Sequence, residues 1–194
     1  MPLRPFPIPF KVGTDICYVP RIRKFITQPS NGEPQRPLRR LLRKLLTEHE
    51  RRYFWQRFGS GAPFNSIERV SQFLAGRFAA KEACRKACTH LDPKSRGFQH
   101  VMILPVTANE RDRYKSGRPQ GLILDEVYTA GAEPEADLVE SRGVGTVDEG
   151  IGEVAENSKP LADINELNGQ LCEISISHDG DYATAVAIVA FAKG

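Results

Sequence analysis

A proline-free stretch, Gln72 to Cys88, contains the densest group of side chains that could do chemistry. Its alanine content and the helical spacing of its apolar residues predict a single helix. On a helical wheel, one face is almost entirely small: Phe73, Gly76, Ala80, Ala83, Cys84 and Ala87. The opposite face holds one carboxylate among four cations, with Leu74 and Phe78 between them: Arg77, Lys81, Glu82, Arg85 and Lys86. Two interpretations are open, namely a solvated lattice of ion pairs such as Glu82 with Lys86, or a functional site.

Two further segments carry polar residues where a site could form. Lys11 to Ile16 reads KVGTDI, a short strand in which Gly13 would allow close backbone approach just before Asp15. Ser175 to Val189 starts as an alternating strand, and His178 precedes the turn signal Asp179-Gly180. Taken singly, such an aspartate is most often a turn or cap residue, and a histidine at a strand end is most often a surface residue.

These three segments together, in this order, resemble the holo-acyl carrier protein synthase type of 4'-phosphopantetheinyl transferase. That family pairs an aspartate in an amino-terminal GxD segment with the glutamate of a RFAAKEA helix, and it has a carboxy-terminal S-x-[ST]-H strand end. Gly117, Arg118 and Pro119 also resemble its G-[KR]-P turn before a strand. The resemblance covers roughly residues 1–120 and 171–192, and it does not extend to 125–169.

The resemblance implies Mg²⁺-dependent transfer of 4'-phosphopantetheine from coenzyme A to a serine of apo-acyl carrier protein, releasing 3',5'-phosphoadenosine, as in fatty acid biosynthesis. Displacement at the β-phosphorus of a pyrophosphate needs charge neutralisation more than a protein nucleophile. Asp15 and Glu82 would supply the hard oxygen ligands that Mg²⁺ prefers. Glu82, directly or through a bound water, is the first candidate for the base that takes the serine proton. His178 is the second, and the sequence does not separate them.

The resemblance also implies a set of side chains around coenzyme A. Lys86, with Lys81 and Arg77, would offset phosphate charge. The residues expected to contact coenzyme A are Asp15, Arg77, Lys81, Glu82, Lys86, Gly117, Arg118, Pro119, Ser177 and His178. Those expected to act in catalysis are Glu82, Lys86 and His178.

Basic residues in the first half of the chain are candidates for holding the acidic acyl carrier protein. Relatives use an arginine at the position of Arg21 and basic residues on the following helix, where Arg40 and Lys44 fall. Residues 1–120 contain 24 Lys and Arg against nine acids, about +15, whereas residues 121–194 contain three against fifteen, about −12. The positive charge of residues 1–120 favours an acidic partner.

The same charge permits an alternative, a non-catalytic module that binds RNA or anionic lipid. It would use the basic residues Arg39, Arg40, Arg43, Lys44, Arg51 and Arg52. No stacking-aromatic motif accompanies them, and this alternative leaves Asp15, Glu82 and His178 unexplained. We therefore expect neither nucleic acid nor membrane as a partner.

Around these segments the sequence predicts an α+β domain, a small and largely antiparallel sheet packed on the 72–88 helix with a basic helical flank. Strands are expected at residues 10–16, 99–108, 120–124, 171–177 and 182–191. Helices are expected at 19–26 and 38–58, the second with a break near Thr47, where Thr47 and Glu50 could form a capping box. Residues 1–194 would form a single domain, with an acidic insertion at 125–169 whose composition favours mobility.

Several features bear on the compartment and assembly. Four cysteines lack zinc-ligand spacing, which indicates free thiols in a reducing compartment. Four prolines in the first ten residues argue against an import helix and a secretory signal, and cleavage of an ordinary targeting peptide would remove Asp15. We expect an intracellular protein without a membrane span, in the mitochondrial matrix or the cytoplasm. The resemblance implies a homotrimer with sites between subunits.

Overall fold

Five strands form one antiparallel sheet with the order β1-β5-β4-β3-β2. This computed structural model describes residues 9–30, 34–59, 66–88, 97–105, 119–127 and 167–190. Its strands are β1 (Phe10–Tyr18), β2 (Val101–Pro105), β3 (Pro119–Leu124), β4 (Gly169–Asp179) and β5 (Tyr182–Ala190). Residues 1–8, the Gly117-Arg118 part of the predicted turn and nearly all of the predicted insertion lie outside the described residues.

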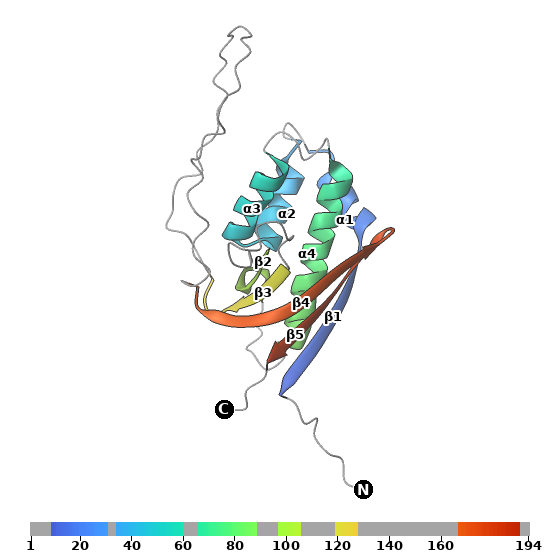
Figure 1. The fold of residues 1–194 in the computed structure, drawn as a ribbon. Coiled ribbons are helices and arrows are strands. Elements are labelled where there is room, and N and C mark those ends of the chain that lie inside the picture. The colour runs from blue at the N-terminus through green and yellow to red at the C-terminus, as the bar shows by residue number, and fades with distance from the viewer. Residues whose placement is uncertain are drawn as a thin grey trace, which may run out of the picture.

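The helices lie on one side of the sheet (Figure 1). They are α1 (Val19–Ile26), α2 (Arg36–Leu45), α3 (Glu48–Phe58) and α4 (Ile67–Ala87), with the 3-10 helix η2 (Phe98–His100) before β2. The predicted α+β class is confirmed, and so is the break near Thr47. Thr47 caps α3, and its backbone N–H donates to Glu50 Oε2 at 2.8 Å in a capping box.

Some boundaries differ from the prediction for local reasons. Helix α4 begins at Ile67, five residues earlier than expected, and buried Val70 extends its apolar side. Strand β2 begins only at Val101, because residues 98–100 form η2, and it occupies a sheet edge as Pro105 indicated. In the β4–β5 hairpin Asp179 pairs with Tyr182, so the two turn residues are Gly180-Asp181, and Gly180 takes the positive φ of 51°.

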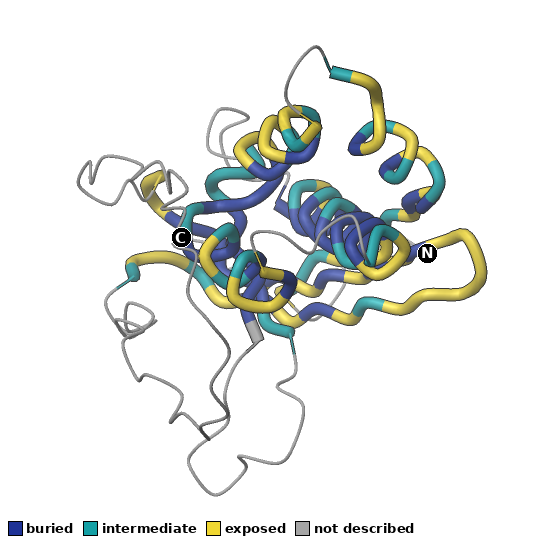
Figure 2. Tube along the Cα trace, turned by 90° about the horizontal axis from the view of Figure 1, so that it is seen from above, coloured by how far each residue is buried: buried dark blue, intermediate teal, exposed yellow. Residues whose placement is uncertain are grey.

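The core depends on close packing of α4 against β1 and β5. Ala80, Ala83 and Ala87 are fully buried, and β5 meets them with equally small residues, Ala183, Ala185 and Ala187. A Cβ added at Gly13 would lie 2.0 Å from the carbonyl oxygen of Ala83 and 2.7 Å from the amide nitrogen of Ala87. The predicted close approach at Gly13 is therefore confirmed, and it places β1 against the carboxy-terminal half of α4. Figure 2 shows this buried inner side of the helix.

The predicted polar face of the 72–88 helix is wrong in part. Leu74, Arg77 and Lys81 are buried rather than solvated. Helix α3 contacts this part of α4, because Phe54 and Phe58 pack on Phe73 and Glu50 pairs with Lys81. Of the charged residues on that face, Lys86 is exposed and Glu82 and Arg85 are partly exposed. A helix between a sheet and a second helix layer has two buried sides, which a two-face wheel does not anticipate.

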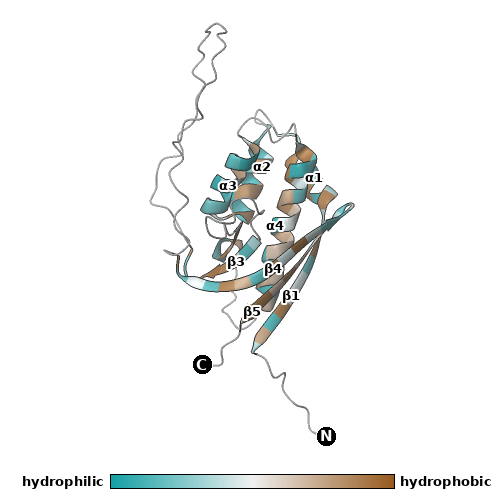
Figure 3. Cartoon of the chain, viewed as in Figure 1, coloured by the Kyte–Doolittle hydropathy of each residue, from teal (hydrophilic) through white to brown (hydrophobic). Residues whose placement is uncertain are grey.

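The sheet face turned away from α4 is apolar and open. Its exposed large hydrophobic residues are between 38% and 63% accessible: Val12, Ile16, Tyr18, Leu171, Tyr182, Val186 and Ile188. Figure 3 shows brown, apolar segments on β1, β4 and β5 alternating with pale and teal ones. All four cysteines are free thiols, as expected. Within the described ranges, no helix combines the length and apolar character needed to cross a membrane.

Replacing Gly13 by alanine tests the contact between β1 and α4. The new Cβ would meet helix backbone, which cannot move aside as a flexible side chain can. We expect Gly13→Ala to destabilise the fold by about 3 kcal/mol, measured by urea unfolding. Gly97→Ala is the matched control, because its Cβ would meet nothing closer than His100 Nδ1 at 3.5 Å. Equal stability of the two variants would contradict the proposed tight packing.

Candidate active site

Asp15 and Lys86 meet where β1 crosses α4. Gly13, Asp15 and Cys17 alternate on the strand face that is turned to the helix. The Lys86 ammonium donates to Asp15 Oδ1 at 2.8 Å and to the Thr14 carbonyl oxygen at 2.9 Å. The Asp15 side chain is 15% exposed, and its other oxygen, Oδ2, is buried without a hydrogen-bond partner. A buried carboxylate oxygen without a hydrogen-bond partner is a candidate for binding an ion or a substrate group.

Glu82 lies one helical turn before Lys86, so it projects from the same side of α4. Its Oε1 accepts from the Arg85 guanidinium at 2.7 Å. Asp15 on β1 contacts Lys86, and Glu82 lies one turn before Lys86 on α4, so the two carboxylates predicted to act together lie beside the same part of α4. Each of them is paired with a cation from the last turns of α4.

The donor chemistry of this surface fits a magnesium ion. The two side chains offer carboxylate oxygens, the ligand type that Mg²⁺ prefers, and Asp15 Oδ2 is an available acceptor. Among the residues that the structure describes, no group of three or more histidine, cysteine or acidic side chains could hold a metal ion. A magnesium ion here would therefore use the two carboxylates and complete its coordination with substrate oxygens and water, its usual mode.

Lys81 and Arg77 do not belong to this surface. The Lys81 side chain is 0% exposed, and its ammonium donates to Glu50 Oε2 at 2.6 Å and to the Phe98 carbonyl oxygen at 2.9 Å. Burial lowers the pKa of Lys81, and Glu50 opposes that shift. Arg77 is 8% exposed and stacks on Phe73, 4.7 Å from the ring centroid. The expectation that Lys81 binds phosphate is at odds with this burial.

Glu50 is a residue that sequence reasoning underestimated. It was expected only as a capping residue, yet its Oε1 also accepts from the Ile103 backbone N–H at 3.1 Å. One buried carboxylate thereby joins α3, α4 and β2. No local pattern indicates this role, because Glu50 and Lys81 are 31 residues apart.

His178 and Ser177 lie apart from the two carboxylates. The His178 Nε2 is 3.0 Å from the Gln72 carbonyl oxygen, to which it donates, and the ring packs on Gly76. Gln72 precedes Glu82 by ten residues, roughly 15 Å along the helix axis. Ser177 is exposed and alternates to the opposite face of β4. Within one chain, therefore, Ser177 and His178 do not face the same space.

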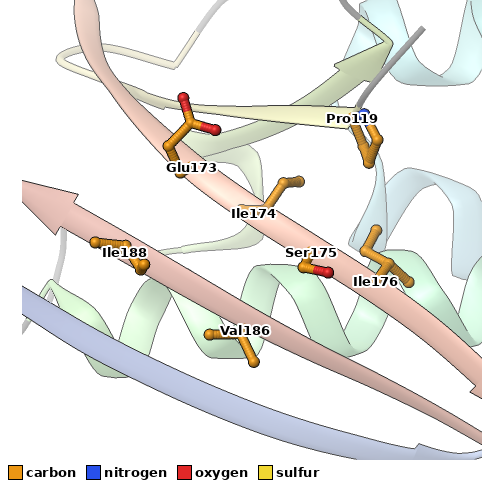
Figure 4. Close-up of a pocket in the computed structure, with 7 residues that line it drawn as sticks. All are labelled: Pro119, Glu173, Ile174, Ser175, Ile176, Val186 and Ile188. Atoms are coloured by element: carbon orange, nitrogen blue, oxygen red, sulfur yellow. The ribbon is translucent and has the colours of Figure 1, made fainter.

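Pro119 borders a hollow in the sheet, with a volume of about 350 Å³. Figure 4 shows the side chains that line it, which come from β3, β4 and β5: Pro119, Glu173, Ile174, Ser175, Ile176, Val186 and Ile188. Of the three residues predicted beside the nucleotide, Gly117 and Arg118 lie outside the described part of the chain. The hollow is thus near Pro119; Glu173 and Ser175 share the face of Ser177, whereas Ile174 and Ile176 alternate to the other side of β4.

The basic residues predicted to hold the acceptor are exposed. Arg21 on α1 lies over the ring of Phe78, with its guanidinium carbon 5.2 Å from the centroid. Phe78 is one helical turn before Glu82. Arg40 and Lys44 project from α2 into solvent. Arg51 donates a hydrogen bond to the Leu46 carbonyl oxygen, and Arg52 forms an ion pair with Glu48.

Comparison with known proteins identifies the class. Residues 11–128 match the sequence profile of the family described as the 4'-phosphopantetheinyl transferase superfamily. The chain belongs to that superfamily of enzymes, as the three motifs indicated.

Individual relatives agree with this assignment. The chain is 32% identical to "4'-phosphopantetheinyl transferase B, mitochondrial" of Aspergillus fumigatus, over 98% of this chain and 99% of that protein. It is 27% identical to a holo-[acyl-carrier-protein] synthase of Corynebacterium efficiens, over 93% and 94% of the two chains. Among solved structures, the holo-ACP synthase of Plasmodium yoelii is similar in fold, with a TM-score of 0.50 and 19% identity over 94% of this chain and 95% of that one.

The buried ion pair makes a prediction about stability. Replacing Lys81 by methionine leaves Glu50 charged and buried without its counter-ion, so we expect Lys81→Met to cost about 3–5 kcal/mol in urea unfolding. The double variant Glu50→Gln/Lys81→Met removes both charges and should be markedly more stable than Lys81→Met alone. If instead the single and double variants unfold together, the pair is not the reason for the burial of Lys81.

Proposed function

We propose that this protein transfers the 4'-phosphopantetheine group of coenzyme A to a serine hydroxyl of an apo-acyl carrier protein, with Mg²⁺. The observation that carries the proposal is the contact of Asp15, which keeps an unpartnered buried oxygen, with Lys86, one helical turn after Glu82. The membership of the chain in the superfamily supports the assignment of 4'-phosphopantetheine as the group that is transferred. The serine oxygen bonds to the β-phosphorus, and the bond from that phosphorus to the oxygen of the departing 3',5'-phosphoadenosine breaks.

The side chains contribute charge and a proton acceptor. Asp15 and Glu82 would hold Mg²⁺, which when bound neutralises pyrophosphate charge. Lys86 lies 2.8 Å from Asp15 and is half exposed, so its ammonium can turn toward phosphate oxygens. Glu82 is our candidate to accept the serine proton. His178 is a poorer candidate, because its Nε2 already donates to the Gln72 carbonyl oxygen and Glu82 lies well along the helix.

The separation of the predicted residues supports a site shared between subunits. Asp15 and Lys86 lie at the β1–α4 crossing, whereas Ser177 belongs to the open sheet face. A second chain packed on that face would cover its exposed apolar residues, such as Ile16, Tyr182 and Ile188. We infer a homotrimer in which coenzyme A contacts residues of two neighbouring chains.

The acceptor surface that we propose consists of three exposed cations, Arg21 on α1 and Arg40 and Lys44 on α2. Arg21 contacts Phe78, which lies one helical turn before Glu82 on α4. An acidic carrier protein bound there would bring its serine toward Glu82. Long-range attraction of this kind speeds association and selects acidic partners. By its similarity to a mitochondrial transferase, we also propose that the protein works in the mitochondrial matrix.

The metal assignment predicts a loss of transfer in two variants. Asp15→Ala and Glu82→Ala should each reduce the labelling of apo-carrier protein by a fluorescent coenzyme A at least about 100-fold. Both should also lose Mg²⁺-dependent coenzyme A binding. The control is Glu68→Ala, which removes an exposed carboxylate from the first turn of the same helix. Near-parent transfer by either site variant would mean that the residue is wrongly assigned.

The acceptor assignment predicts a change that depends on salt. Reversing the charge of Arg21, Arg40 and Lys44 to glutamate should raise the KM for carrier protein at least about tenfold at low ionic strength. The KM for coenzyme A should change little. The difference should shrink at high salt, because exposed charges are screened.

A control for this experiment reverses Arg52 and Arg69, two exposed cations on α3 and at the start of α4. If the control raises the carrier-protein KM as much as the triple variant does, net charge rather than a defined surface attracts the acceptor.

A further inference from the structure

Arg85 is the residue of this surface that neither the expected chemistry nor the acceptor surface uses. Its guanidinium donates to Glu82 Oε1 at 2.7 Å across three residues of α4. The contact is in a partly shielded position, with the Arg85 side chain 39% and the Glu82 side chain 23% exposed. The pair therefore retains more attraction than a fully solvated one.

The Arg85 guanidinium contacts the ring of Phe98 as well as Glu82. The guanidinium carbon lies 5.2 Å from the Phe98 centroid, a cation–π distance. Phe98 is itself held, because its carbonyl oxygen accepts from buried Lys81 and its ring packs edge-on to Phe78 at 5.6 Å. Phe98 of η2 thus supports the positive charge of Arg85 beside the Glu82 carboxylate.

The cation partners of Asp15 and Glu82 differ in how they are held. Lys86 holds Asp15 by Oδ1 alone and leaves the buried Oδ2 without a partner, and the Lys86 side chain is 54% exposed and can leave. Arg85 is held from behind by an aromatic ring and keeps its charge within a few ångströms of Glu82. A divalent cation that binds Glu82 must therefore approach a fixed guanidinium.

We propose that Arg85 is a positioning residue that competes with the divalent cation for Glu82 and so weakens metal binding by the chain without substrate. Rupture of the Arg85–Glu82 pair and repulsion between the two cations both oppose the metal. The pair keeps Glu82 oriented while the site awaits an anionic substrate, whose phosphates would offset the repulsion. This inference rests on the metal assignment in the proposed function.

The test measures metal binding directly, with Mn²⁺ alone and without coenzyme A, by electron paramagnetic resonance of the free ion. Arg85→Met keeps an apolar side chain against Phe98 but removes the charge and the donor. We expect its Kd for Mn²⁺ to fall by about 3- to 10-fold relative to the parent. Arg85→Lys retains the charge and should bind Mn²⁺ nearly as the parent does. The gain in Arg85→Met should diminish at high ionic strength.

A matched control separates local competition from net charge. Arg52→Met removes one arginine from an i,i+4 pair with Glu48 in which the Arg52 side chain is 41% exposed, close to the exposure of Arg85. Its Kd for Mn²⁺ should match that of the parent. Both methionine variants should melt within about 3 °C of the parent, because partly exposed helical ion pairs add little stability.

The outcomes distinguish this inference from the proposed function. If the parent shows no Mn²⁺ binding that Asp15→Ala abolishes, the metal site is wrong and the role of Arg85 falls with it. If the parent binds Mn²⁺ through Asp15 but Arg85→Met binds equally or more weakly, the metal site stands and competition by Arg85 is wrong. Tightening in Arg52→Met equal to that in Arg85→Met would also overturn it.

Discussion

The contact between β1 and α4 without intervening side chains is the constraint on which the site depends. Gly13 leaves no room for a Cβ beside the backbone of Ala83 and Ala87. At this short separation, the next inward-facing residue of the strand, Asp15, comes within hydrogen-bonding distance of Lys86. A larger residue at the crossing would move the strand away and separate the two carboxylates. The small residues of β5 extend the same close packing across the sheet.

The rotation of α4 about its axis depends on a second constraint, the buried pair of Glu50 and Lys81. Successive helical residues differ by about 100° around the axis, so adjacent residues Lys81 and Glu82 take different roles. Lys81 enters the core under α3, whereas Glu82 remains at the surface. Removing two charges from water is costly. The hydrogen bond from Lys81 to the Phe98 carbonyl oxygen and the one from the Ile103 backbone N–H to Glu50 offset part of that cost. We infer that the pair selects one orientation of the helix.

The distribution of the site over two faces follows from strand geometry. Ser177 and His178 are neighbours in β4, and alternation sends one to the open sheet face and the other to Gly76 of α4. The apolar open face is the natural place for another chain to bind. A protein built in this way could use the surface of one chain to supply what the neighbouring chain lacks, which is consistent with the proposed trimer.

The sequence by itself predicted what depends on local pattern. Helix α1, the capped break at Thr47, the edge position of the Pro105 strand and the terminal hairpin follow from periodicity, proline and turn residues. The resemblance of three motifs pointed to the superfamily, which the comparisons confirm. Assignments in the chain beyond the described residues, including most of the acidic insertion, stay predictions.

Only the tertiary structure decided which charged residues of α4 face which neighbour. One helical wheel grouped Arg77, Lys81, Glu82 and Lys86 together, but α3 covers the first two and leaves the others open. The partners of Lys81 and Asp15 come from segments far along the chain, Glu50 and Lys86 respectively. Local propensity carries no information about such contacts. Their positions are determined by the packing of layers, since burial of a charge is tolerated only where a distant partner is brought to it.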